Sequence, residues 1–107
     1  MITLYTPWLP LKLRGLALRW VVLIHRDSRY DQSLHNHEKI HIEQMKEIGT
    51  LVYAYKYFTS QEFRAGVEAE AFLFGSGYTK AKTHKILTEF YRVDDMVARQ
   101  ALSFYNI

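Results

Sequence analysis

Residues 34–58 read LHNHEKIHIEQMKEIGTLVYAYKYF, and the rest of the chain can be interpreted around them. The apolar residues recur at mixed steps of three and four, the period of an α-helix. Asn36 is a candidate N-cap for this helix, and Ser33 is the alternative. We expect the helix to continue to about Phe58, with Gly49 as a weak point inside it because glycine disfavours helix.

The segment before this helix predicts a small β element. Residues 16–24, LALRWVVLI, are rich in β-branched and aromatic side chains, so we expect one or two strands with a bend near Arg19. Pro7 and Pro10 each remove an amide donor. Residues 1–12 should therefore be extended and irregular, at best an edge strand.

A second helix should follow the first after a short break. Residues 59–62, TSQE, have the form of a capping box, with Thr59 as the N-cap and Glu62 reaching back to it. The helix should then start near residue 60 and end at Gly75 and Gly77.

A third helix should run from residue 80 or 82 to Phe104, with apolar positions that include Ile86, Leu87, Phe90, Val93, Val97, Ala101 and Leu102. The sequence thus predicts an α+β, mostly helical fold, in which a short N-terminal β element precedes about three helices. With 107 residues, of which 49% are hydrophobic, the chain suits a single domain over residues 1–107.

Composition narrows the chemistry that this domain can carry. The chain has no cysteine, which excludes disulfides and thiolate metal sites and fits a reducing compartment. Any metal must be held by His, Asp or Glu. The net charge of +3 is mild, and its one local basic cluster (Lys80, Lys82, His84 and Lys85) is typical of a solvated face. We therefore do not expect nucleic-acid binding.

The sequence contains neither a recognisable secretory signal nor an apolar run long enough to span a membrane. The first residues lack the basic and apolar regions of a secretory signal. The longest apolar runs, residues 21–24 and 71–74, fall far short of the roughly 20 residues that a membrane span requires. We expect no membrane association and a cytoplasmic protein.

His37-Glu38-Lys39-Ile40-His41 matches the pattern H-E-x-x-H. Histidines four residues apart lie one above the other on a helix, so both imidazoles can bind one metal ion. The residue after the first histidine lies at the edge of the same face, where its carboxylate can act as general base on a metal-bound water. The motif therefore predicts Zn²⁺ bound by His37 and His41, with Glu38 as the catalytic base.

Zinc with two histidines needs a third protein ligand. Glu68 and Glu70 lie in the predicted second helix, where they are about 200° apart, so only one of them should face the metal. The small residues that share a side with Glu68 favour it weakly, because they allow close helix approach. Glu70 remains the alternative.

The pattern His37-Glu38-x-x-His41-x-x-Gln44, followed by Glu68-x-Glu70-Ala71, resembles the gluzincin clan of zinc metallopeptidases. The resemblance spans roughly residues 16–74 and extends to short phage and bacterial proteins of this type. It implies that Glu68 is the third ligand and that residues 20–24 form the cleft edge that pairs with substrate. If the protein is phage-encoded, its cytoplasm is that of a bacterial host.

One position departs from the gluzincin pattern. These enzymes commonly carry an aspartate four residues after the ligand glutamate, where it orients a zinc-binding histidine, and this chain has Phe72 there. Asp27, Asp31, Asn36 or a backbone carbonyl could take the place of this aspartate.

The candidate transition-state donors are Tyr30, Tyr78, His84 and Tyr91. Gln44 and the tyrosines Tyr53, Tyr55 and Tyr57 are expected to be packing residues.

The expected function is that of a zinc-dependent metallopeptidase-like protein, which hydrolyses peptide or protein substrates with zinc-activated water. The alternative is a non-catalytic zinc scaffold or protein-interaction module derived from a peptidase, because the chain is short and lacks the aspartate that orients a zinc-binding histidine. The aromatic content and small size also make a homodimer reasonable.

Overall fold

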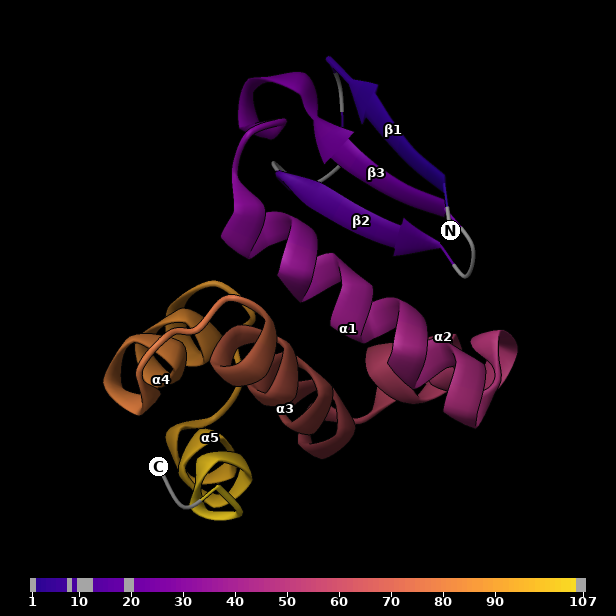
Figure 1. Cartoon of the computed structure of the whole chain (residues 1–107). Helices are drawn as coiled ribbons and strands as arrows, with labels where there is room; N and C mark the ends of the chain where they lie inside the picture. The colour runs from indigo at the N-terminus through magenta and orange to yellow at the C-terminus, as the bar shows by residue number, and fades with distance from the viewer. Residues whose placement is uncertain (1, 8, 10–12, 19–20, 106–107) are drawn as a thin grey trace.

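The computed structural model describes residues 2–7, 9, 13–18 and 21–105. It has an α+β fold, in which a small N-terminal sheet precedes a mostly helical body, so the predicted fold class is confirmed (Figure 1). The described elements are, in order, β1 (Ile2–Thr6), β2 (Gly15–Leu18), β3 (Val21–His25), η2 (Arg26–Ser28), α1 (Gln32–Ile48), α2 (Thr50–Thr59), α3 (Gln61–Glu70), η3 (Ala71–Gly75), α4 (Lys80–Glu89) and α5 (Asp95–Ser103).

The three strands form one sheet with the order β1-β3-β2. β1 runs parallel to β3, pairing Ile2 with Val21, while β2 runs antiparallel to it, pairing Gly15 with Ile24. β1 is thus an edge strand, as predicted, and the bend expected at Arg19 lies outside the described residues. β3 is the central strand. The expectation that residues 20–24 form the cleft edge was therefore wrong for residues 21–24, and Trp20 lies outside the described residues. The edge strand that packs against α1 is β2.

The predicted long helix is divided at Gly49. This glycine has a φ of 97°, a conformation that other residues rarely adopt. α1 therefore ends at Ile48, and α2 leaves in a new direction. The N-cap of α1 is neither Asn36 nor Ser33 but Asp31, whose carboxylate accepts a hydrogen bond from the amide of Leu34 (3.2 Å).

The capping box is shifted by one residue. Ser60, not Thr59, caps α3 and accepts a hydrogen bond from the amide of Phe63 (3.1 Å). Thr59 belongs to α2, where its hydroxyl donates to the carbonyl of Tyr55. α3 continues into the π-helical turn η3, which ends at Gly75 as predicted.

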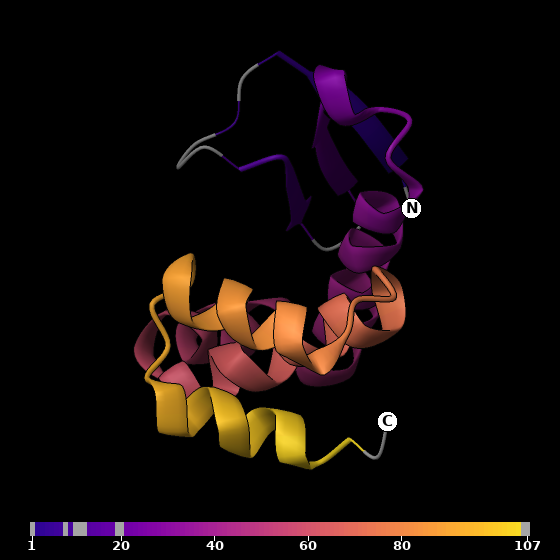
Figure 2. The same cartoon turned by 90° about the vertical axis from the view of Figure 1, so that its left-hand side faces the viewer.

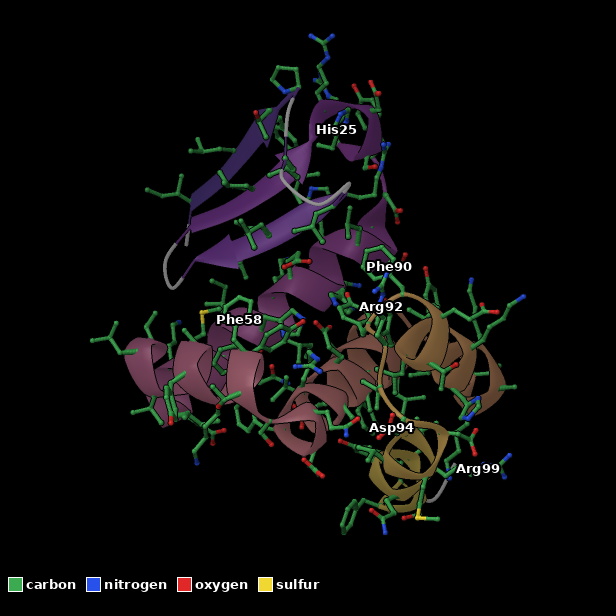
Figure 3. The ribbon with its side chains drawn as sticks, turned by 180° about the vertical axis from the view of Figure 1, so that it is seen from behind. His25, Phe58, Phe90, Arg92, Asp94 and Arg99 are labelled. Atoms are coloured by element: carbon green, nitrogen blue, oxygen red, sulfur yellow. The ribbon has the colours of Figure 1, made fainter. Side chains whose placement is uncertain are left out.

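The predicted third helix is two helices, α4 and α5, so that prediction was wrong. The chain turns at Arg92, whose φ is 55°, and Figure 3 labels Arg92 and Asp94 in this turn. Gln61 at the start of α3 fixes the turn, because its amide accepts from the backbone N–H of Asp94 and donates to the Asp94 carboxylate. A tertiary contact therefore overrides a continuous helical pattern.

Two hydrophobic clusters lie on opposite sides of α1. One joins the sheet to α1 through Ala17, Val22, Ile24 and Ile42. The other joins α3, η3, α4 and α5, and contains Ala65, Ala69, Leu73, Leu87, Val93, Ala98, Ala101 and Leu102. Figure 2 shows the sheet at one end of the molecule and α5 at the other. Within the described ranges, no helix has the length and hydrophobicity needed to cross a bilayer.

Candidate metal centre

Helix α1 brings two imidazoles together on its buried face. His37 and His41 lie one turn apart, and only 3% and 6% of their surfaces are exposed. Their Nε2 atoms are 3.0 Å apart, and their ring planes meet at 80°. Both Nε2 atoms therefore face the same small volume.

Glu68 from α3 completes the cluster. Its Oε1 lies 3.0 Å from Nε2 of His37 and 2.9 Å from Nε2 of His41. The neighbouring Glu70 instead accepts a hydrogen bond from Gln44 (3.0 Å). The structure thus brings Glu68, and not Glu70, to the two histidines, and the three side chains form a group that could hold a metal ion.

Gly75 makes this meeting of α1 and α3 possible. A Cβ atom at Gly75 would lie 2.8 Å from the Cα of His37 and 2.8 Å from the carbonyl oxygen of Asn36. These are rigid backbone atoms, so only glycine lets η3 pass so close to α1. Because η3 continues α3, this contact holds Glu68 beside the two histidines.

Protons alone cannot satisfy the three ligand atoms. Each Nε2 can carry one hydrogen and a carboxylate carries none when ionised, so at most two of the three close pairs can be hydrogen-bonded. With both hydrogens in place, the N–H groups of His37 and His41 would face each other at 3.0 Å. One cation between the three atoms interacts favourably with all of them, so the donor set fits a metal ion.

The electrostatics of the cluster also favour a positive charge at this point. Burial alone would raise the pKa of Glu68, but the imidazoles of His41 and His37 hold it well below its usual range. Burial would lower the pKa of His41, but the Glu68 carboxylate raises it to about 9. The carboxylate is thus ionised, and in the metal-free protein the positive charge beside it is the proton on His41, which a bound metal ion would replace.

Glu38 lies next to the cluster and faces the sheet. It is buried, with 6% of its surface exposed, and this burial raises the pKa of its carboxyl group. A Cβ atom at Gly15 would lie 3.1 Å from Oε1 of Glu38. The carboxylate therefore packs against the start of the edge strand β2.

Two phenols contact the carboxylate of Glu68. Tyr57 of α2 donates a hydrogen bond to Oε2, and Tyr91, which follows α4, interacts with the same carboxylate as a hydrogen-bond partner. Burial and the Glu68 charge raise the pKa of both phenols, so both stay protonated at neutral pH. Oε1 is left to face the histidines.

Of the four candidate transition-state donors, Tyr91 is the one that the structure brings to Glu68. Tyr30 is 87% exposed, Tyr78 stacks on Phe72, and His84 lies 2.7 Å from the carboxylate of Asp95.

The partners of the histidine Nδ1 atoms differ from those expected. Nδ1 of His41 lies 2.9 Å from Oε1 of Gln44 and 3.0 Å from the hydroxyl of Tyr53. Nδ1 of His37 lies 3.5 Å from the hydroxyl of Ser76. Phe72, at the expected aspartate position, packs its ring against His37 with centroids 4.2 Å apart.

The residues considered as substitutes for the missing aspartate have other partners. Asp27 contacts His25, Asp31 caps α1, and Asn36 accepts a hydrogen bond from Gln32. Gln44, Tyr53 and Tyr57 were expected to be packing residues and were therefore missed. The one signal in the sequence is Gln44, three residues after the second histidine, where it shares that residue's face of the helix.

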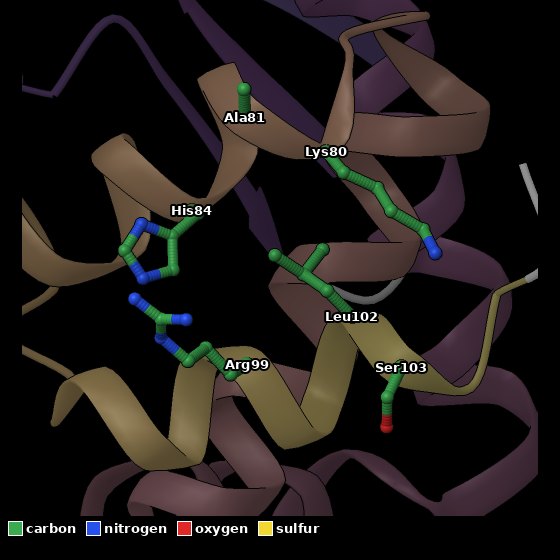
Figure 4. A pocket seen from close by; sticks show the side chains of 6 residues that line it. All are labelled: Lys80, Ala81, His84, Arg99, Leu102 and Ser103. Carbon is green, nitrogen blue, oxygen red and sulfur yellow. The ribbon is translucent and has the colours of Figure 1, made fainter.

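Two members of the basic cluster of α4, Lys82 and His84, contact neighbouring side chains. His84 and Arg99 both contact the carboxylate of Asp95, each at 2.7 Å, and the Lys82 ammonium lies 3.8 Å from the centre of the Tyr78 ring. Figure 4 shows Lys80 and His84 of α4 opposite Arg99 of α5. These residues line a pocket of about 430 Å³. This pocket is lined by residues other than those of the His37–His41–Glu68 cluster.

Comparisons with protein-family models, with curated proteins and with solved structures found no match to this chain.

Proposed function

We propose that this protein is a zinc-dependent hydrolase of the metallopeptidase type, with His37, His41 and Glu68 as zinc ligands and Glu38 as general base. The observation that carries the proposal is the convergence of three ligand atoms, each within 3.0 Å of the other two. Two imidazole nitrogens and one carboxylate oxygen are a ligand set of catalytic zinc sites, which leave a fourth position for water or substrate.

The donor set favours zinc over the common alkaline-earth cations. Calcium and magnesium prefer all-oxygen coordination, whereas imidazole nitrogens such as those of His37 and His41 suit zinc and similar transition metals. Zinc adds no redox chemistry, and a bound zinc ion would supply the Lewis acidity that polarises a carbonyl and acidifies water.

Glu38 has the position and the environment of a general base. Its carboxylate lies beside Gly15 of β2 and near the His37–His41–Glu68 group, and burial raises its pKa, which makes the carboxylate a stronger base. In the proposed reaction it takes a proton from the attacking water and delivers it to the leaving amine.

The edge strand β2 supports a peptide as the substrate. β2 ends the sheet on the side of Glu38, and an extended peptide can add to such an edge through backbone hydrogen bonds. Gly15, which carries no side chain, lies where such a strand would approach the carboxylate.

The second candidate function is a non-catalytic zinc scaffold, and burial is the observation that favours it. His37 and Glu68 are each only 3% exposed, so a substrate would reach them only if neighbouring elements moved apart. Such a protein would keep the three ligands and would not need Glu38.

Metal content tests the zinc site itself. We expect about one zinc per chain in wild type, and none in His41→Ala or Glu68→Gln. Glu62→Gln is the matched control, because Glu62 is an exposed glutamate on the same helix as Glu68, and it should retain zinc. Wild-type protein without zinc, purified in the absence of chelators, would contradict the proposal.

Two measurements then separate the two functions. Glu38→Gln should retain zinc and lower peptide hydrolysis by at least about 100-fold, the usual contribution of a general base. In cobalt-substituted protein, acetohydroxamate should change the visible spectrum only if a coordination position is open. Hydrolysis that survives Glu38→Gln contradicts the catalytic assignment, and a spectrum that does not respond favours the scaffold.

A further inference from the structure

Gln44 is a buried polar residue one turn after His41 on α1, and the proposed reaction gives it no role. Only 6% of its surface is exposed. Its Oε1 lies 2.9 Å from Nδ1 of His41, on the side of the imidazole opposite the ligand atom Nε2.

The orientation of the Gln44 amide is fixed by its other partners. Its Nε2 donates to the carbonyl oxygen of Val67 (3.0 Å) and to the carboxylate of Glu70 (3.0 Å). Both partners can only accept, so the NH₂ group must face α3 and the amide oxygen must face His41. Tyr53 strengthens this arrangement by donating its hydroxyl hydrogen to the same oxygen (3.1 Å).

An amide oxygen can only accept, so the hydrogen of a neutral His41 must lie on Nδ1. We propose that Gln44 is a positioning residue that keeps His41 in this tautomer and so leaves the Nε2 lone pair free for the metal, with Glu70 holding the amide in place. This inference rests on the proposed zinc site. Hydrogen bonds of this kind orient metal-binding imidazoles and raise their basicity.

His37 provides an internal comparison. Its Nδ1 faces the hydroxyl of Ser76 at 3.5 Å, and that hydroxyl donates to the carbonyl of Ser33 (3.2 Å), so its oxygen is oriented to accept. The contact is longer than the one between Gln44 and His41. The tautomer of His41 is therefore held more firmly than that of His37.

The first test replaces Gln44 with methionine, which has a similar volume and cannot accept the imidazole hydrogen. We expect Gln44→Met to weaken zinc binding by about 10–100-fold, the usual effect of losing such a partner, when the dissociation constant is measured against a chromophoric chelator. Gln32→Met is the matched control, because Gln32 is an exposed glutamine on the same helix, and its affinity should equal that of wild type.

The second test exchanges the two side chains of the pair. In Gln44→Glu/Glu70→Gln, the carboxylate at position 44 accepts from Nδ1 of His41, and the amide at position 70 donates to that carboxylate. The carbonyl of Val67 keeps the backbone N–H of Ala71 as a donor. We expect this double variant to bind zinc within a few-fold of wild type, so it also serves if Gln44→Met does not fold.

A third measurement distinguishes positioning from packing. In zinc-loaded wild type, the Nδ1 hydrogen of His41 should give a slowly exchanging imidazole NMR signal, which Gln44→Met loses and the double variant regains. A purely structural role would lower the stability of the metal-free protein and leave zinc affinity unchanged. Unchanged affinity in Gln44→Met, or a double variant no better than it, overturns this proposal alone. Absence of zinc from wild type overturns the proposed function with it.

Discussion

Glu68 connects the two histidines of α1 to a tyrosine of α2 through its two carboxylate oxygens. Its Oε1 faces the two histidines of α1, while its Oε2 accepts from Tyr57 of α2. A buried carboxylate is stable in its ionised form only when charges or donors surround it, and here each oxygen has its own set. The two oxygens are therefore not equivalent, and only Oε1 is available to a metal.

Replacing Tyr57 with phenylalanine tests this division of the carboxylate. The variant removes one donor from Oε2, so Glu68 should be held less firmly, and zinc affinity should fall by about 10-fold, at the lower end of the range for such contacts. Competition with a chelator measures this loss. Tyr55→Phe is the control, because Tyr55 is 71% exposed on the same helix. Equal affinities in the two variants would contradict the role of Tyr57.

Asp31 makes a different, pH-dependent contribution at the start of α1. The hydroxyl of Ser33 and the amide of Leu34 both donate to its carboxylate, and they lower its pKa from the ordinary value of 3.8. Because the folded pKa is the lower one, the stabilisation is present above pH 3.8 and is lost as the pH falls through the folded pKa.

Asparagine caps helices about as well as aspartate and does not titrate. Asp31→Asn should therefore match wild type in urea unfolding at pH 7 and become the more stable of the two below about pH 3.8. Asp31→Ala should be about 1 kcal/mol less stable than both at pH 7. If the difference in unfolding free energy between wild type and Asp31→Asn did not change between pH 7 and pH 3, the role of the charged cap would be contradicted.

At the scale of single residues, the sequence predicts which side chains share a helix face better than it predicts the hydrogen-bond partners of those side chains. His37, His41 and Glu38 follow from a local pattern on one helix, because the spacing alone determines which residues share a face. The partners of those residues come from α2, α3 and the turn after α4, whose approach depends on tertiary packing. Gln44 was missed for this reason, since its role appears only when Val67 and Glu70 lie opposite it.

Among the elements, the contact between η3 and α1 determines whether the cluster forms. Gly75→Ala would put a Cβ atom 2.8 Å from the backbone of His37, so the two elements must separate. We expect a loss of about 1–3 kcal/mol in unfolding free energy, as for other overpacked sites, together with weaker zinc binding as Glu68 moves away.

Gly66→Ala is the control for this change. Gly66 lies in α3, and no neighbouring atom that the structure describes lies within 4 Å of a Cβ placed there. Alanine favours helix by about 1 kcal/mol over glycine, so this variant should be as stable as wild type or more stable. If both variants had the same effect on stability and zinc binding, the loss in Gly75→Ala would not come from the contact with α1.

The same elements show where sequence reasoning succeeds and fails. Thr59 lies 18 residues after His41 and Glu68 only nine residues after Thr59, which a straight helical hairpin cannot reconcile. Gly49 was identified as a weak point, and its positive φ resolves the mismatch. No comparable residue marks the turn at Arg92, because Gln61 holds it from a distant part of the chain.

At the scale of the whole molecule, the His37–His41–Glu68 group lies between α1, which packs on the sheet, and α3, which belongs to the other hydrophobic cluster. The sheet packs on one side of α1, and α3, η3, α4 and α5 form the other cluster. The two histidines belong to α1 and Glu68 to α3, so a metal ion bound between them would join the two halves. Zinc should therefore contribute to global stability as well as to chemistry.

Removing zinc should lower the melting temperature of the entire protein in one cooperative transition. A ligand that binds only the folded state stabilises it by about 4 kcal/mol when its free concentration is 1,000 times its dissociation constant. For a chain of about 100 residues, each kcal/mol shifts the melting temperature by roughly 4–8 °C, so a chelator should lower the melting temperature by roughly 16–32 °C. Calorimetry of wild type and Glu68→Gln, each with zinc and with chelator, measures this. Glu68→Gln should melt at the same temperature in both conditions, because it lacks the ligand that joins α3 to α1. If the melting temperature of wild type were also the same with zinc and with chelator, a bridging metal would be contradicted.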